Sequence, residues 1–434
     1  MIAVKQDMVE RLNEDCLCRT VDLGALGQSL ALEIGDAGFA AELGQTHPDL
    51  MSRQPVYLSA DHARRMAEIV VTIERVAKLP AYREAVLAHA PEIARFDPGP
   101  IGVFMGYDFH LGPDGPKLIE INTNAGGGLL NAYLAEARQA CCITLDEAFP
   151  RPPGMAEMER RFVSSFAAEW RRQGAGRPLA RIAIVDDAPA TQFLYPEFRL
   201  FQRLFERHGI AAVIADPADL RWRDGALSYH LARIDLVYNR LTDFALDGPP
   251  CANLRKAYLA GAVAVTPNPR AHALFADKRN LIPLTDRTML QSWGVSAPDL
   301  ETLIAGVAKT MSVAAADPDA LWSARNGLFF KPARGHGSKA AYRGDKITKR
   351  VWADILQGDY VAQELVRPSA RGVNVDGARQ DMKVDIRNYC YDGAVQLLAA
   401  RLYQGQTTNM RTAGGGFAAV VSGEVTSDVA CACR

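Results

Sequence analysis

The sequence lacks any hydrophobic run that approaches the roughly 20 residues of a membrane-spanning helix. Residues 1–20 carry acidic side chains among the basic ones, which is unlike a secretory signal peptide. Cysteine is scarce, with 8 in 434 residues, and none forms a CxxC pair of the kind found in zinc ribbons or thioredoxin-like sites. We therefore expect a soluble cytoplasmic protein with reduced thiols and no membrane partner.

An excess of charge of one sign is also lacking. The formal net charge is -1, from 49 Lys and Arg against 50 Asp and Glu, and 48% of the residues are hydrophobic. This composition is typical of a globular protein and gives no reason to expect nucleic-acid binding. Because 434 residues are too many for one ordinary core, we expect two or three cooperating lobes.

Two familiar binding motifs are absent or weak. No GxxxxGK[ST] sequence occurs, which excludes a Walker-type P-loop. The cysteines include two CxC pairs near the chain ends, Cys16 with Cys18 and Cys431 with Cys433. Four thiolates would suit a soft metal, but surface or terminal thiols are the simpler interpretation.

Hydrophobic periodicity divides the chain. Apolar residues recur every three or four positions within 59–96 and within 155–172, which predicts helices. Strand and helix patterns alternate over 181–269, as in an open parallel α/β sheet. Two more helices, expected at 278–293 and 300–312, lead into a strand-rich α+β region. The predicted fold class is therefore α/β and α+β with several lobes.

The first polar constellation lies on a predicted hairpin around the turn sequence GPDGP. Alternation puts Glu120 and Asn122 on one face of their strand and Ile119 on the other. A five-residue loop at 112–116 would place Asp108 opposite Glu120. Neighbouring carboxylates repel unless a cation lies between them, and these oxygen ligands suit Mg²⁺ bridging nucleotide phosphates. A solvated hairpin face without metal is the alternative.

A glycine-containing loop follows a later predicted strand. In LFFKPARGHGSKA, Lys331 ends the strand, and Gly335 and Gly337 open a loop whose backbone N–H groups suit a phosphate. His336 in this loop is interpreted as a solvent-facing residue. The run GHGSKA also fits a loose G-x-G-x-x-A dinucleotide pattern, but no amphipathic helix pattern follows it, so that fit is poor.

The last third of the chain adds polar residues on predicted strands. Gln363 and Glu364 lie in the middle of DYVAQELV, which by itself is most simply an ordinary strand. Arg387, Arg401 and Arg411 lie on or just after successive strands. Guanidinium groups there would suit bidentate contact with phosphate or carboxylate, and scattered surface arginines are the alternative.

Together these segments resemble the ATP-grasp superfamily. Their order resembles its circularly permuted branch, which includes eukaryotic glutathione synthetase and, more distantly, glutathionylspermidine synthetase. KLIEINTNAGGGL is similar to the family's magnesium strand and glycine turn, and ADKRN and FFKPARGHG are similar to the segments that carry its two nucleotide lysines. VAQELV resembles the hinge that reads adenine, and DIRNY with AARLYQGQTTNMRTAGGGFAAV resembles the closing stretch of related peptide ligases.

The resemblance implies ATP and Mg²⁺ as cofactors and gives roles to individual residues. It implies metal binding by Asp108, Glu120 and Asn122; nucleotide binding by Lys278, Lys331, Gly335, Gly337, Gln363, Glu364 and Leu365; catalytic contacts by Arg387, Arg401 and Arg411; and substrate contacts by Arg240, Gly415 and Gly416. One departure is Gly335, where glutathione synthetase has a metal-binding glutamate. Asp108 would take its place.

The implied fold is a circularly permuted ATP-grasp fold with an open parallel α/β (pre-ATP-grasp) substrate domain. The expected divisions are a helical support region (1–95), the metal-binding hairpin and glycine turn (96–150), a helix and linker (151–180), the α/β substrate domain (181–270) and the nucleotide-binding lobes (271–434). The implied activity joins a small-molecule carboxylate to an amine through an acyl phosphate, and a homodimer is common in such relatives. A small-molecule kinase and a non-catalytic nucleotide-binding module are the alternatives.

Overall fold

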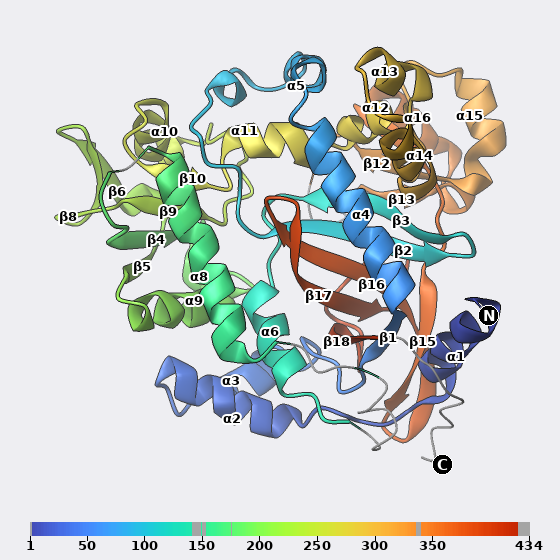
Figure 1. Ribbon diagram of the computed structural model, residues 1–434, viewed down its shortest axis with the longest axis horizontal. Helices are drawn as coiled ribbons and strands as arrows, with labels where there is room; N and C mark the ends of the chain where they lie inside the picture. The colour runs from blue at the N-terminus through green and yellow to red at the C-terminus, as the bar shows by residue number, and fades with distance from the viewer. Residues whose placement is uncertain (1, 141–148, 150–152, 175, 336–339, 424–434) are drawn as a thin grey trace.

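The computed structural model describes residues 2–140, 149, 153–174, 176–335 and 340–423. The described residues form helices and four β-sheets, the largest of seven strands (Figure 1). Within the described residues, every helix is too short or too polar to cross a membrane.

The large sheet combines strands from the first third and the last third of the chain. Its strand order is β1-β18-β17-β16-β2-β3, with β15 paired to β16, and only the β1–β18 pair is parallel. The strands are β1 (Val56–Ser59), β2 (Met105–Gly112), β3 (Gly115–Asn122), β15 (Ser369–Val375), β16 (Ala378–Tyr391), β17 (Ala394–Tyr403) and β18 (Gly416–Gly423). The hairpin with the predicted metal strand thus lies beside strands from the last third of the chain.

Helices cover both faces of the large sheet. On one face α4 (Ala60–Val76) and α14 (Ala297–Gly306) share a core with the apolar side chains of β2, β16 and β17. The predicted three-and-four spacing is confirmed in α4, where Met66, Ile69 and Ile73 are buried. The opposite face packs on α6 (Gly128–Glu136) at one end and is polar at the other.

The predicted parallel sheet is confirmed. Its order is β10-β9-β4-β5, and every pair is parallel. Its strands are β4 (Arg181–Val185), β5 (Ala211–Ala215), β9 (Leu236–Asn239) and β10 (Ala264–Thr266), with helices α8 (Met155–Arg172), α9 (Tyr195–Arg207) and α10 (Ala252–Leu259). A three-stranded antiparallel sheet was not predicted. It consists of β6 (Leu220–Arg223), β7 (Ala226–Tyr229) and β8 (Ala232–Arg233).

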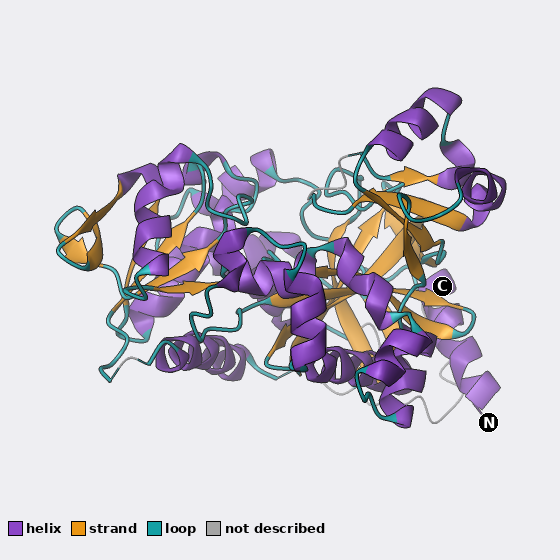
Figure 2. Cartoon of the chain, turned by 90° about the horizontal axis from the view of Figure 1, so that it is seen from above, coloured by secondary structure: helices purple, strands orange, loops and turns teal. Residues whose placement is uncertain are grey.

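A second antiparallel sheet, here called the small sheet, stands beside the large one (Figures 1 and 2). Its order is β11-β14-β12-β13. Its elements are β11 (Thr310–Ser312), β12 (Leu328–Pro332), β13 (Tyr342–Arg343), β14 (Tyr360–Glu364), α15 (Pro318–Ala324) and α16 (Lys349–Gln357). The remaining long helices are α1 (Ile2–Asp15), α2 (Leu23–Ile34), α3 (Phe39–Thr46) and α5 (Pro80–Leu87).

The two helices predicted before this sheet were wrong in their extents. The first is broken into a 3-10 turn (Lys278–Asn280), α12 (Leu281–Leu284) and α13 (Arg287–Ser292). Asp286 interrupts it, because its side chain accepts the Met289 N–H and starts a new helix. The second prediction ran through the end of α14 into β11, which begins at Thr310.

Candidate functional site

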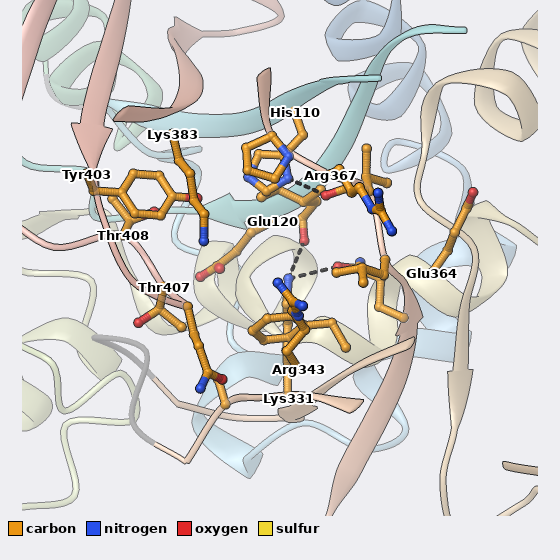
Figure 3. Close-up of a pocket in the computed structure, with 18 of the residues that line it drawn as sticks. His110, Glu120, Lys331, Arg343, Glu364, Arg367, Lys383, Tyr403, Thr407 and Thr408 are labelled. Atoms are coloured by element: carbon orange, nitrogen blue, oxygen red, sulfur yellow. Dashed lines mark hydrogen bonds between the residues drawn. The ribbon is translucent and has the colours of Figure 1, made fainter. Parts of the chain in front are cut away.

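A cavity of about 480 Å³ lies between the small sheet and the polar face of the large sheet (Figure 3). Such a volume is within the range of small-molecule and cofactor sites. Of the residues predicted to bind nucleotide or metal, the cavity is lined by Glu120, Lys278, Lys331, Gly335, Gln363, Glu364 and Leu365. These residues come from segments far apart in the sequence, and the fold brings them together.

The two predicted nucleotide lysines face the predicted metal strand. Lys278 lies at the start of a 3-10 turn, with its Nζ 3.9 Å from a Glu120 carboxylate oxygen and 3.1 Å from the Gly335 carbonyl oxygen. Lys331, on β12, donates from its Nζ to the Ile119 carbonyl at 3.0 Å and to Gln363 Oε1 at 2.7 Å. Two cations and one carboxylate therefore meet at one end of the cavity.

Burial perturbs Lys331. Its relative exposure is 9%, and the loss of hydration lowers its pKa to about 8 from the usual 10.5. Glu120 opposes this effect and Lys278 adds to it. Lys331 is thus a cation whose charge is only partly balanced in the protein alone, which favours an anionic ligand nearby.

The segment predicted as the adenine hinge ends β14 at the rim of the cavity. Gln363 Nε2 donates to Thr310 Oγ1 at 3.1 Å, and the Glu364 carboxylate pairs with Lys117 Nζ at 3.1 Å. The N–H groups of Glu364 and Leu365 donate to the carbonyls of Lys309 and Gly327. These donors are already used inside the protein, and the adenine role of the segment stays a prediction.

The hairpin pairs Asp108 with Glu120, as predicted, but by a different route. The predicted five-residue loop was wrong, because Gly112 pairs with Gly115 and only two residues form the turn. A β-bulge between Asp108 and Phe109 then adds a residue to β3 and restores the expected pairing. The prediction that Ile119 lies on the face opposite Glu120 assumed regular alternation, which the bulge interrupts at Ile119.

Asp108 is held by arginines from two neighbouring strands. Arg387 bonds both of its carboxylate oxygens, at 2.7 and 2.8 Å, and Arg401 and Asn122 donate to Oδ2 at 2.8 and 2.9 Å. Burial by itself would raise the pKa of Asp108, but Arg387 and Arg401 outweigh it and hold the pKa below its usual range. These pairs form a buried charge network beside the cavity rather than a part of its lining.

The donor set fits a hard divalent cation in part. Glu120 faces the cavity, and no described residue donates a hydrogen bond to the amide oxygen of Asn122. Both oxygens of Asp108 are taken by guanidinium and amide groups, so it would join the ligands only by exchanging one of them. Across the described part of the chain, no cluster of three or more His, Cys, Asp or Glu has the spacing of a metal site. Phosphate oxygens and water would supply the remaining ligands, as is usual for Mg²⁺.

The glycine turn after β3 connects the hairpin to the parallel sheet. Asn124 Nδ2 donates to the carbonyls of Arg240 and Leu241, and Glu197 accepts the Gly127 N–H at 2.7 Å. Arg240 follows β9 and is 7% exposed, with a 3.4 Å contact to the Tyr238 hydroxyl. Its Nε has no hydrogen-bond partner among the described residues. Such a buried, incompletely paired guanidinium lies where the sheet's carboxyl edge meets the glycine turn.

Other predicted site residues lie away from the cavity lining. Arg411 is exposed on the loop between β17 and β18. Gly415 and Gly416 are buried, and a Cβ at either would lie 2.5 Å or less from backbone oxygens, so close packing accounts for them. Their catalytic and substrate roles stay predictions. The predictions for His336, Gly337, Cys431 and Cys433 lie outside the described residues.

Several cavity residues were not singled out from the sequence. They are His110, Arg343, Arg367, Lys383, Tyr403, Thr407 and Thr408. Strand alternation carried a signal for some of them, because Lys383 lies four residues before Arg387 on β16, and Tyr403 lies two after Arg401 on β17. Positions on the same strand face as a candidate site residue were therefore candidates too.

Comparison with known proteins gives a fold. No family model matches the sequence, and no curated protein matches it. A glutathione synthetase-like effector (GSS30) from Globodera pallida has 12% sequence identity, covers 94% of this chain and 99% of its own, and superposes with a TM-score of 0.58. A candidate gamma-glutamylcysteine synthetase from Methylobacillus flagellatus KT has 9% identity, 80% and 84% coverage and a TM-score of 0.45. The ATP-grasp ligase PsnB, complexed with a minimal precursor, has 13% identity, 56% and 89% coverage and a TM-score of 0.29.

The GSS30 match extends over nearly the whole of both chains, so it concerns the arrangement of all the sheets. At 12% identity the likeness is one of fold alone. The chain therefore shares the multi-lobed α/β fold of GSS30, and the predicted α/β and α+β fold class is confirmed.

Proposed function

We propose that this protein is an ATP- and Mg²⁺-dependent ligase that joins a carboxylate to an amine through an acyl phosphate. The observation that supports this most is the convergence of Lys278, Lys331 and Glu120 at one end of a cavity between two antiparallel sheets. A buried lysine with a lowered pKa is unfavourable for the protein alone, and a polyphosphate would stabilise its charge.

In this proposal the nucleotide lies along the cavity. Lys278 and Lys331 contact its phosphates, and the base lies toward the segment from Gln363 to Leu365. Glu120 and Asn122 would hold Mg²⁺, joined by Asp108 after exchange of a guanidinium. When bound there, Mg²⁺ would offset the negative charge of the phosphates.

The reaction needs no covalent enzyme nucleophile. A carboxylate oxygen of the substrate attacks the γ-phosphorus of ATP, and the bond to ADP breaks. The amine nitrogen then attacks the acyl carbon, and phosphate leaves as the nitrogen loses a proton. Such chemistry depends mainly on positioning and on charge, which the lysines and the arginines Arg387, Arg401 and Arg411 would supply. Arg240 would bind the substrate from the parallel sheet.

The test is ADP release by the purified protein with ATP and Mg²⁺, screened against pooled carboxylic acids with and without pooled amines and amino acids. Release that requires both pools supports the ligase. Release without an amine, together with a stable phosphorylated product, would replace it by a small-molecule kinase. Nucleotide binding without turnover in any pool would favour a binding module.

Matched variants connect any turnover to this cavity. Lys331→Ala and Glu120→Ala should abolish ADP release while the protein stays folded. Lys78→Ala is the control, because Lys78 is an exposed residue paired with Asp392 on the surface. Full ADP release by both cavity variants would show that the site lies elsewhere.

A further inference from the structure

A second buried carboxylate, outside the cavity lining, pairs with the charge network around Asp108 and connects it to a loop at the cavity. Asp385, on β16, is fully buried and does not line the cavity. Its Oδ1 accepts Arg401 Nε at 2.6 Å, and Arg401 Nη2 reaches Asp108 Oδ2 at 2.8 Å. Arg401 thus bridges two buried carboxylates, one of them at the predicted metal position.

The other oxygen of Asp385 holds a loop at the cavity. Asp385 Oδ2 accepts the hydroxyl of Thr408, which lies between β17 and β18 and lines the cavity with Thr407. Asn409 stabilises the same loop, because its Nδ2 donates to the Gln404 carbonyl at 2.7 Å and its Oδ1 accepts the Thr412 hydroxyl at 3.0 Å. The loop also carries Arg411.

Strand registers explain why these groups meet. Asp385 is opposite Arg401 across the β16–β17 pair, and Arg387, two residues along β16, is opposite Asp108 on β2. Because side chains alternate along a strand, residues 385, 387 and 401 share the polar face of the large sheet. These charged side chains therefore form a row from the loop after β17 to the hairpin that carries Glu120.

We propose that Asp385 is a positioning residue that sets how strongly Arg401 holds Asp108 and anchors the loop through Thr408. Its pairing with Nε leaves Arg401 one hydrogen bond to Asp108, from Nη2, rather than the bidentate pair that Arg387 makes. Its negative charge also offsets one guanidinium near the metal position. This inference rests on the proposed function, since it concerns cation binding at Asp108, Glu120 and Asn122.

The first test is Asp385→Asn. Without the charge, Arg401 can turn both edges to Asp108, and the site gains one positive charge. The Mg²⁺ concentration that half-saturates binding in the presence of ADP should rise at least about tenfold, because removing a nearby negative charge disfavours a divalent cation. ADP affinity without metal should stay the same or rise, because the loss of a negative charge favours the anionic phosphates. Calorimetry measures both, and Asp385→Glu, which keeps the charge, is the control.

The second test is Thr408→Val, with Thr408→Ser as the variant that keeps the hydroxyl. Loss of the hydroxyl frees one oxygen of Asp385, so Arg401 gains a second contact there and its hold on Asp108 weakens. Half-saturating Mg²⁺ should then fall or stay within about twofold, while trypsin cleavage after the exposed Arg411 becomes at least about fivefold faster. Thr408→Ser should match the original protein in both measurements.

The directions in which Mg²⁺ binding changes in the two variants distinguish a positioning role from a general loss of structure. A merely structural defect would weaken cation binding in both Asp385→Asn and Thr408→Val, and that result would overturn the proposal. Unchanged Mg²⁺ binding in Asp385→Asn would do so as well. If Asp385→Asn does not fold, equal Mg²⁺ binding and equal trypsin cleavage in the two Thr408 variants would refute the loop connection. Failure of the unsubstituted protein to bind ADP at all would instead refute the proposed function.

Discussion

The lowered pKa of Lys331 makes nucleotide affinity depend on pH in a defined window. In the protein alone, burial brings the pKa from 10.5 to about 8, which corresponds to about 3 kcal/mol of disfavoured charge. A phosphate beside Nζ favours the protonated amine and raises its pKa again. Binding therefore takes up a proton whenever the pH lies above about 8.

The magnitude follows from this linkage. Below pH 8 the amine is protonated in both states, and affinity is independent of Lys331 titration. Above it, affinity falls about tenfold per pH unit until the pKa of the complex is reached, so ADP should bind about 30-fold more weakly at pH 9.5 than at pH 7. The sign is fixed, because the free site loses its proton first as the pH rises.

Calorimetry with metal-free ADP between pH 7 and 9.5 measures the effect, and two buffers of different ionisation enthalpy measure the proton uptake. Lys331→Arg is the matched control, because a guanidinium stays charged over this range and should give a flat profile. Circular dichroism at each pH checks the fold. If the original protein and Lys331→Arg show the same pH profile, Lys331 does not titrate in this window and the reasoning is wrong.

Further substitutions test other parts of the structure. Glu120→Gln should lower ADP release at least about 100-fold and raise the Mg²⁺ requirement, seen by titrating turnover with Mg²⁺. Arg240→Met should raise KM for the carboxylate at least about tenfold and leave ADP affinity unchanged, which steady-state kinetics and calorimetry separate. Gly127→Ala should lower stability by about 2 kcal/mol or more, seen as a lower Tm, because φ is +90° and the new Cβ would lie 2.2 Å from the Phe417 ring. Burial lowers the pKa of His272 to about 3, so stability should fall by about 2 kcal/mol between pH 6.5 and 5 in the original protein, and Tm scans of His272→Phe should lack this loss.

Local patterns predicted much of the fold. The three-and-four spacing of α8 and α4, and the alternation of strand and helix segments in the parallel sheet, can be recognised from residues close together in the sequence. These predictions were confirmed. The hairpin shows a limit. Its sequence does not reveal that the turn is two residues long and that an extra residue near Ile119 compensates, because a bulge is stabilised by the strands on either side.

The charge network was beyond sequence reasoning for a different reason. The arginines were recognised as candidates for phosphate contact, yet Arg387 and Arg401 pair with Asp108 across 279 and 293 positions of sequence. Which carboxylate meets which guanidinium depends on the register of β16 against β2 and β17. A one-residue slip of either pair would turn these side chains to the apolar face, so no local pattern could assign the partners.

The charges at one end of the cavity come from distant segments of the chain. The small sheet supplies Lys331, and the hairpin near the other end of the chain supplies Glu120 and Asp108. In the assembled molecule, Lys331 donates to the backbone of Ile119 in the hairpin, and Asp108 is neutralised by Arg387 from β16. The cavity thus lies where Lys331 of the small sheet meets Glu120 and the Ile119 carbonyl of the large sheet, and a polyphosphate with its cation would add matching charges at that junction.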